Sequence, residues 1–126
     1  MKKMIALLLA AMMVLSMAAC ASKTAAAADS DLAYIQDKGT LVIGITDFEP
    51  MDYKDADGSW IGFDADMAKA FAESLGVTAE FVEIDWDNKI LELDSKTIDC
   101  VWNGMTLTAE VTSTMECSNA YCNNAQ

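Results

Sequence analysis

An alternation of β-rich and helical segments over residues 40–104 constrains the possible folds of this chain most strongly. Three β-rich runs, TLVIGIT, VTAEFVEI and TIDCVWNG, are separated by two helical patterns, FDADMAKAFAESLG and DWDNKILELDSK. Strands that alternate with helices in this way form a parallel sheet through right-handed crossovers, with the helices on its faces. We therefore predict an α/β fold, a three-layer parallel-sheet lobe.

Turn and capping residues predict two further elements around the first strand. Ser30 is suited to cap a short helix in SDLAYIQDKG, and Gly39 to end it. The pair Asp57-Gly58 lies between two short apolar stretches, which is typical of a β-hairpin turn. The folded part of the chain is therefore expected to begin near Asp31 and to include one hairpin before the second helix.

The helix expected over residues 63–76 has an apolar face and acidic residues at its start. Asp64 is suited to cap it. The large apolar residues recur in steps of four, which places them on one helical face: Phe63, Met67, Phe71 and Leu75. For the next helix, Asp85 or Asp87 is the expected cap.

Composition excludes several function classes. The 126 residues include 20 acidic residues and 8 lysines, without arginine or histidine, and the net charge is −12. Nucleic acid is an unexpected partner, because phosphate binding depends on clustered Lys and Arg. A histidine general base and a bidentate arginine clamp are both excluded. The length suits one domain at most.

The N-terminus has the features of a secretory signal. A basic MKKM precedes an apolar run over residues 4–19, shorter than the roughly 20 residues that a membrane-spanning helix needs. The run ends in SMAAC, which resembles the lipobox of bacterial lipoproteins, with Met17 in place of the usual leucine. We predict a signal peptide over residues 1–19, lipidation of Cys20, and a flexible tether over residues 20–30. The alternative is an ordinary signal peptide, with Cys20 incidental.

Three motifs in order carry a resemblance to a known family: GFDADMAKA at residues 62–70, DWD at 85–87, and D-x-x-x-x-GMTLT at 99–108. Together they resemble the first lobe of the family 3 extracellular solute-binding proteins, the amino-acid-binding receptors of ABC importers. The similarity extends over residues 32–126. It implies a type II periplasmic-binding-protein fold, here incomplete, as a first lobe without the strand that returns from the second lobe.

The resemblance implies a function and a location. The protein is expected to be the extracellular substrate-binding component of an ABC importer, capturing a small polar solute of amino-acid type in a cleft between two lobes. Residues 31–126 correspond to lobe 1, truncated at the interlobe crossing near SNAYCNNAQ; a natural single-lobe protein is the alternative. The expected partners are a permease with its ATPase, and the membrane through the N-terminal lipid. The expected location is the extracellular face of a bacterial cell membrane.

Two other functions on the same fold remain open. One is an extracellular ligand-sensing domain. The other is an enzyme, a dehydratase acting on cyclic acids, which needs cations to hold two carboxylates. The chain has no arginine for that purpose, so we predict that it is not an enzyme. We also expect no cofactor.

Ligands of open parallel sheets bind beyond the carboxyl ends of the strands. Three loops are expected there, over residues 47–52, 85–88 and 103–108. From the resemblance, Asp47 holds a ligand ammonium or caps a turn, Phe48 lines the cleft, and Trp86 stacks on the ligand or packs under its helix. The third loop adds the remaining candidates: Asn103, Gly104, Met105, Thr106 and Thr108. Of Trp102 and Asn103, strand alternation favours Asn103 as the residue that faces the cleft.

One position departs from the family pattern. Relatives commonly place an arginine that grips the α-carboxylate where this chain has Val111. With no cation expected at this loop, we predict a cationic, amidated or otherwise carboxylate-poor solute. Cys100 is expected to be a buried apolar residue in a strand. Cys117 and Cys122 are too separated in an extended segment to pair, and they form a poor metal site, so no metal is expected.

Overall fold

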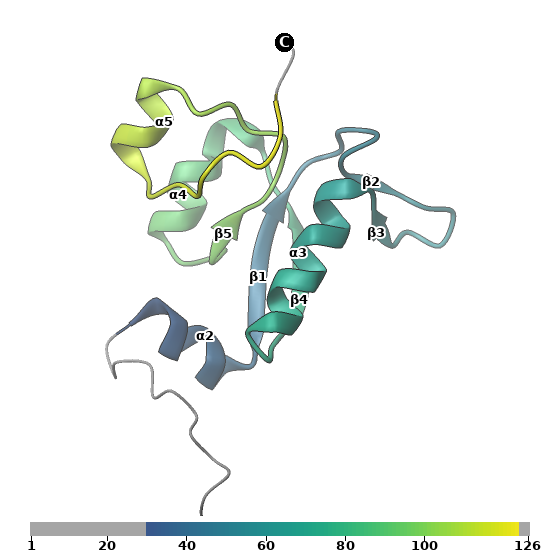
Figure 1. Cartoon of the computed structure of the whole chain (residues 1–126), viewed down its shortest axis with the longest axis horizontal. Helices are drawn as coiled ribbons and strands as arrows, with labels where there is room; N and C mark the ends of the chain where they lie inside the picture. The colour runs from purple at the N-terminus through teal and green to yellow at the C-terminus, as the bar shows by residue number, and fades with distance from the viewer. Residues whose placement is uncertain (1–29, 124–126) are drawn as a thin grey trace, which may run out of the picture. The chain divides into compact units, whose positions relative to one another are not determined.

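The computed structural model describes residues 30–123 of the chain, and Figure 1 shows their arrangement. The chain divides into two units, residues 1–33 and 34–126. Of the first unit only residues 30–33 are described; there Ser30 Oγ accepts a hydrogen bond from the Ala33 amide at 3.1 Å, as expected of a helix cap. The predictions for the signal, Cys20 and most of the tether lie outside the described residues.

A parallel sheet forms the centre of the second unit. Its strands are β1 (Thr40–Ile45), β4 (Thr78–Glu83) and β5 (Cys100–Val101), in the order β4-β1-β5. β1 pairs in parallel with both neighbours. The predicted α/β fold with a parallel sheet is therefore confirmed, although the third strand is only two residues long.

Helices connect the strands in the predicted order. They are α2 (Asp31–Lys38), α3 (Phe63–Ser74), the 3-10 turn η2 (Trp86–Asn88), α4 (Lys89–Asp94) and α5 (Ala109–Thr114). Figure 1 shows α3 lying along the sheet, with α4 and α5 on the other side of β1 from it in this view. The single helix predicted after β4 is thus a 3-10 turn followed by an α-helix.

The predicted hairpin turn and the predicted cap at Asp85 also form as expected. The hairpin consists of β2 (Tyr53–Lys54) and β3 (Trp60–Ile61), which pair antiparallel around Asp57-Gly58. Asp85 caps η2, because its carboxylate accepts a hydrogen bond from the Asp87 amide at 3.1 Å. The hairpin and this cap were therefore predicted correctly.

The core lies between α3 and the sheet. Leu41 and Ile43 of β1 pack against Ala68 and Ala72 of α3, and all four side chains are buried. A second cluster at the other end of α3 contains Ile45, Trp60 and Ala65. Small alanine side chains allow the helix to approach the sheet closely, which explains why α3 buries them.

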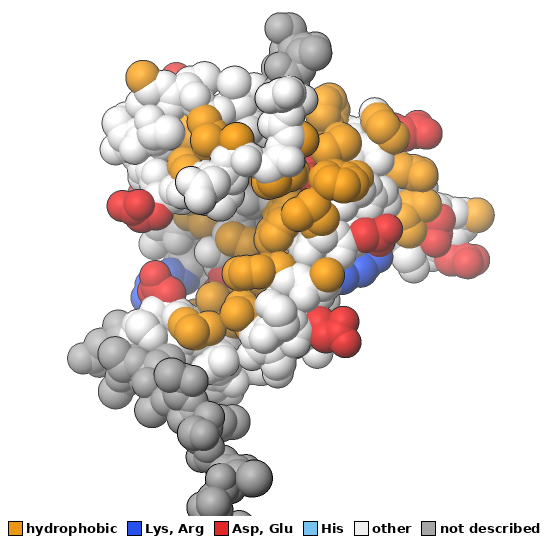
Figure 2. Space-filling view, viewed as in Figure 1, with side chains coloured by type: hydrophobic (Ala, Val, Ile, Leu, Met, Phe, Trp, Pro, Cys, Tyr) orange, Lys and Arg blue, Asp and Glu red, His pale blue; other side chains and the backbone are white. Residues whose placement is uncertain are grey.

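The face by which α3 packs is not the stripe of large apolar residues. Phe63 and Phe71, which belong to that stripe, are 50% and 46% exposed. The buried face instead carries the alanines at positions 65, 68 and 72. Figure 2 shows apolar side chains gathered along α3 on the surface, and the Phe71 ring there lies 5.6 Å from the Trp102 ring.

The capping role predicted for Asp64 is wrong. The N-cap of α3 is Gly62, at φ 114°, and no side chain caps this end. Asp64 is fully buried instead and accepts a hydrogen bond from the Tyr121 hydroxyl at 2.7 Å. Burial raises the pKa of Asp64, although the hydrogen bond from Tyr121 opposes this shift.

A second carboxyl group is buried at the same end of α3. Asp52 is fully buried, and its pKa is raised from 3.8 to about 7 by desolvation first and by the nearby charge of Asp64 second, while the Ala65 amide lowers it. We call Asp52, Asp64 and Tyr121 the carboxylate cluster.

The cysteines of the described segment are unpaired: Cys100, Cys117 and Cys122. Cys100 packs against the core, and burial, followed by the charge of Asp99, raises the pKa of its thiol to about 12. Cys100 is therefore an unreactive side chain packed against the core, although it is half-buried where the sequence predicted a buried residue. Over residues 30–123, no helix is long and apolar enough to cross a membrane.

Candidate functional site

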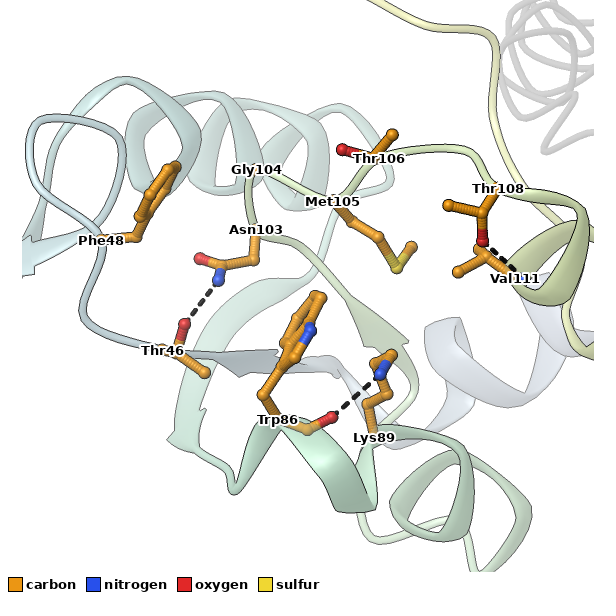
Figure 3. Close-up of a pocket in the computed structure, with 10 residues that line it drawn as sticks. All are labelled: Thr46, Phe48, Trp86, Lys89, Asn103, Gly104, Met105, Thr106, Thr108 and Val111. Carbon is orange, nitrogen blue, oxygen red and sulfur yellow. Dashed lines mark hydrogen bonds between the residues drawn. The ribbon is translucent and has the colours of Figure 1, made fainter. Parts of the chain in front are cut away.

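A cavity of about 350 Å³ lies at the carboxyl ends of the parallel strands. Three chain segments that are distant in sequence form it, and Figure 3 shows their side chains. The segment after β1 contributes Thr46 and Phe48, and the segment after β4 contributes Trp86 and Lys89. The segment after β5 contributes the other six: Asn103, Gly104, Met105, Thr106, Thr108 and Val111. These are the three loops that strand order predicts.

All but one of the predicted site residues line this cavity. The exception is Asp47, which is exposed and does not belong to the lining. Its expected bond to a ligand ammonium stays a prediction. Thr46, Lys89 and Val111 complete the lining; of these, the sequence had singled out only Val111, and only as a departure from the family pattern.

Asn103 faces the cavity, as strand alternation predicted. Its amide nitrogen donates a hydrogen bond to the Thr46 hydroxyl. Its carbonyl oxygen Oδ1 is buried and has no hydrogen-bond partner among the described residues. Trp102, the preceding residue, packs its ring against Phe71 instead. The site therefore offers a fixed, buried acceptor to a ligand.

Gly104 allows close approach by another residue of the site. A Cβ atom at this position would lie 2.7 Å from Cε1 of the Phe48 ring. The absence of a side chain therefore lets the first and third loops come together, and this contact positions Phe48 at the cavity wall.

Thr108 caps a helix and also lines the cavity. It is the N-cap of α5, because its hydroxyl oxygen accepts a hydrogen bond from the Val111 amide at 3.2 Å, and it also lines the cavity. Val111 in the first turn of α5 is 9% exposed and presents an apolar surface. The cap therefore fixes the position of Val111, where the resemblance predicts an arginine in the relatives.

Lys89 brings a cation to the site. Its ammonium nitrogen donates a hydrogen bond to the Trp86 carbonyl at 3.0 Å and lies 4.7 Å from the centre of the Trp86 ring. The loop after β5 contributes no cation to the lining, and the cation comes instead from the segment after β4. The available signal was the spacing: Lys89 follows Trp86 by three residues, so both belong to the same turn at the start of α4.

The lining suits binding more than bond-breaking chemistry. It combines aromatic and apolar walls with neutral hydrogen-bonding groups and one ammonium, and it contains no carboxylate, histidine or cysteine. General acid–base catalysis needs a titratable group positioned at the reacting atoms. Among the lining residues only Lys89 carries one, whereas ligand sites are typically apolar cavities of 300–1,000 Å³ with a few polar groups.

A family comparison identifies this architecture. Residues 41–126 match the model of the bacterial extracellular solute-binding proteins, family 3. The chain belongs to this family. The predicted resemblance is therefore confirmed over more than half of the chain.

Individual relatives agree with the family assignment. The chain is 34% identical to the arginine-binding extracellular protein ArtP of Bacillus subtilis over 122 residues, covering 96% of this chain and 45% of ArtP. It is 33% identical to the cyclohexadienyl dehydratase of Pseudomonas aeruginosa over 95 residues, covering 75% of this chain and 35% of the enzyme. The chain thus spans less than half the length of these relatives.

Solved structures give the same result. An ancestral cationic amino acid solute-binding protein, AncCDT-1, superposes with a TM-score of 0.64 at 44% identity, covering 67% of this chain and 37% of that one. The arginine-bound form of domain 1 from TmArgBP superposes with a TM-score of 0.60 at 38% identity, covering 64% of each chain. The fold is therefore that of one partial lobe of a periplasmic binding protein.

Proposed function

We propose that the complete protein is the extracellular substrate-binding component of an ABC importer, and that it captures a small polar solute of amino-acid type. The observation that carries this proposal is the cavity itself. Three loops that lie far apart in the sequence line this one cavity at the carboxyl edge of the sheet. The sequence had predicted all three loops. Relatives named for binding arginine, such as ArtP, support the solute class.

We also propose that residues 31–126 form the first of two lobes, because the chain spans less than half the length of its curated relatives. The cavity is lined from this lobe alone, and a second lobe would cover its open side. A domain 1 in an arginine-bound form among the similar structures supports a first lobe as the principal binding surface.

Calorimetric titration of the complete protein with the proteinogenic amino acids and L-cystine tests the function. We expect at least one to bind with a dissociation constant in the micromolar range or below. Binding of none of them, by a protein that unfolds cooperatively, would contradict the proposal.

The location is part of the same proposal: a bacterial membrane anchor through a lipidated Cys20, with the permease and ATPase as partners. Membrane fractionation and intact-mass analysis of the mature protein test it. The wild type should fractionate with membranes and carry acyl chains on Cys20, whereas Cys20→Ser should be released or left uncleaved. A soluble wild-type product that starts elsewhere and lacks lipid would exclude the anchor.

A second candidate function follows from the similarity to a cyclohexadienyl dehydratase. The lining disfavours it, because two substrate carboxylates would have to share one ammonium. An assay of the complete protein with a cyclohexadienyl acid decides the question. We expect no turnover above the uncatalysed rate, and turnover abolished by Lys89→Met would establish the enzyme instead.

A further inference from the structure

Lys89 is the one cationic side chain among the residues that line the cavity. It is half-buried, and its ammonium lies against the Trp86 ring. In Figure 3, Lys89 lies toward the side where Met105, Thr108 and Val111 are drawn, while Phe48 and Asn103 lie on the other side of Trp86. A cation therefore lines the same cavity as the valine that stands in place of the family's arginine.

The ammonium of Lys89 has bonding capacity left. A lysine ammonium has three N–H donors, and the structure gives one of them to the Trp86 carbonyl at 3.0 Å. That bond and the ring contact hold the side chain in place without neutralising its charge. An anionic ligand group could accept the remaining donors in a charge-assisted interaction.

Three other lysines of the described segment are paired with carboxylates: Lys38, Lys54 and Lys69. Lys38 lies 2.6 Å from Asp99, and Lys54 lies 2.6 Å from Glu83. Within residues 30–123, Lys89 takes part in no salt bridge, and no carboxylate lines its cavity. Lys96 has no salt bridge in this segment either, but it is exposed and does not line the cavity. A half-buried cation without a counterion is suited to receive one from a ligand.

The opposite part of the cavity has complementary chemistry. Asn103 Oδ1 is a buried acceptor without a partner in the described segment, so it suits a donor such as an ammonium. The lining thus offers an acceptor in one place and a cation in another. A zwitterion with separate donor and anionic groups satisfies both.

We infer that Lys89 binds the carboxylate of the solute, in the role that Val111 cannot fill, and that the solute is a free amino acid and not a carboxylate-poor derivative. This inference rests on the proposed function, because it assumes a solute of amino-acid type in this cavity. It reverses the preference that position 111 alone predicts.

Calorimetry on the complete protein tests the inference with matched ligands. The probes are each proteinogenic amino acid and L-cystine, compared with their C-terminal amides, in the wild type and in Lys89→Met. The methionine keeps an unbranched apolar chain against Trp86 and removes the charge. We expect the wild type to bind the free acid about 10- to 100-fold more tightly than the amide. In Lys89→Met the acid and the amide should bind with nearly equal dissociation constants.

Two further variants make the test specific. Lys54→Met is the matched control, because the Lys54 ammonium also lies over a tryptophan, 4.9 Å from the Trp60 ring, but does not line the cavity. It removes the same charge and should leave the acid-to-amide ratio unchanged. Lys89→Arg keeps the charge and should keep a preference for the acid.

The outcomes separate this inference from the proposed function. If no amino acid binds the wild type, the proposed function fails and the inference falls with it. If one binds, the inference alone fails in either of two cases: the amide binds the wild type as tightly as the acid, or Lys89→Met keeps the wild-type ratio.

Discussion

The surroundings of polar groups differ between the cavity and the carboxylate cluster. At the cavity, the side chains of Asn103 and Lys89 line an open space, and Asn103 Oδ1 has no hydrogen-bond partner in the described segment. In the carboxylate cluster, Asp52 and Asp64 are sealed from solvent, and burial favours their protonated forms. The comparison teaches that a polar group without a protein partner indicates a ligand site only where the surrounding structure leaves space.

The largest effect is expected from a glycine beside the carboxylate cluster. Gly62 has φ 114°, and a Cβ there would overlap the Met51 carbonyl oxygen. The Pro50 carbonyl oxygen lies close as well, and because these are backbone atoms the structure cannot relax easily. Gly62→Ala should therefore cost on the order of 3 kcal/mol or more of unfolding free energy. Urea unfolding followed by circular dichroism measures it.

Gly58→Ala is the matched control for this prediction. Gly58 also has a positive φ, 80°, but nothing lies within 4 Å of a Cβ built there. Its cost should be only the conformational one, about 1 kcal/mol. Equal losses in the two variants would mean that the backbone around Met51 adapts and that the cluster is looser than its burial indicates.

The second effect is a pH dependence of stability that arises in the carboxylate cluster. The folded pKa of Asp52 is about 7, above its ordinary value of 3.8, so between these values the folded state binds more protons than the unfolded state. Unfolding free energy should therefore fall as pH rises from about 4 to about 7, by at most about 1.4 kcal/mol per pH unit for one group. Asp64, whose pKa is also raised, acts in the same direction.

Asp52→Asn tests this assignment, because the amide has nearly the same shape and does not titrate. Chemical unfolding at pH 5, 6, 7 and 8 should give a flatter profile in this variant than in the wild type. Asp57→Asn, at the exposed hairpin turn, should keep the wild-type slope. A wild-type stability that rises steadily from pH 5 to pH 7 would show that both carboxyl groups are charged in the folded state.

The two regions also differ in how far the sequence could predict them. The cavity follows from strand order, because parallel strands bring their carboxyl ends to one edge whatever their side chains are. The carboxylate cluster does not follow from any local rule. A capping role for Asp64 fits local preference, but tertiary packing turns its side chain inward to Tyr121, 57 residues later in the chain.

For α3, helix periodicity alone could not predict which face of the helix is buried. Its sequence contains two stripes, one of large apolar residues and one of alanines at positions 65, 68 and 72. Both satisfy a helical period, so only the close approach of helix and sheet decides which is buried. Lys89 was missed for a related reason, because its long side chain reaches the cavity from the first turn of α4 and not from a predicted loop.

A moderate effect is expected at the cavity from loss of a helix cap. Thr108→Ala removes the hydroxyl that accepts the Val111 amide bond, which should cost about 1 kcal/mol of unfolding free energy. Thr108→Ser keeps the hydroxyl and should remain close to the wild type. Thermal unfolding of the three proteins measures the difference, and an alanine variant as stable as the serine variant would show that the cap contributes nothing.

The smallest effect on stability is expected from a glycine at the cavity, which completes the comparison with Gly62. A Cβ at Gly104 would meet the Phe48 ring at 2.7 Å, and that ring is 40% exposed. A half-exposed ring can rotate away where a backbone carbonyl cannot, so Gly104→Ala should cost less than about 1 kcal/mol of unfolding free energy. The displaced ring nevertheless changes the cavity wall, so the affinity for the solute found by calorimetry should fall more than the stability does.

A stability loss as large as that of Gly62→Ala would mean that Phe48 is held as rigidly as the backbone beside the carboxylate cluster. In that case the cavity wall would be as fixed as the core.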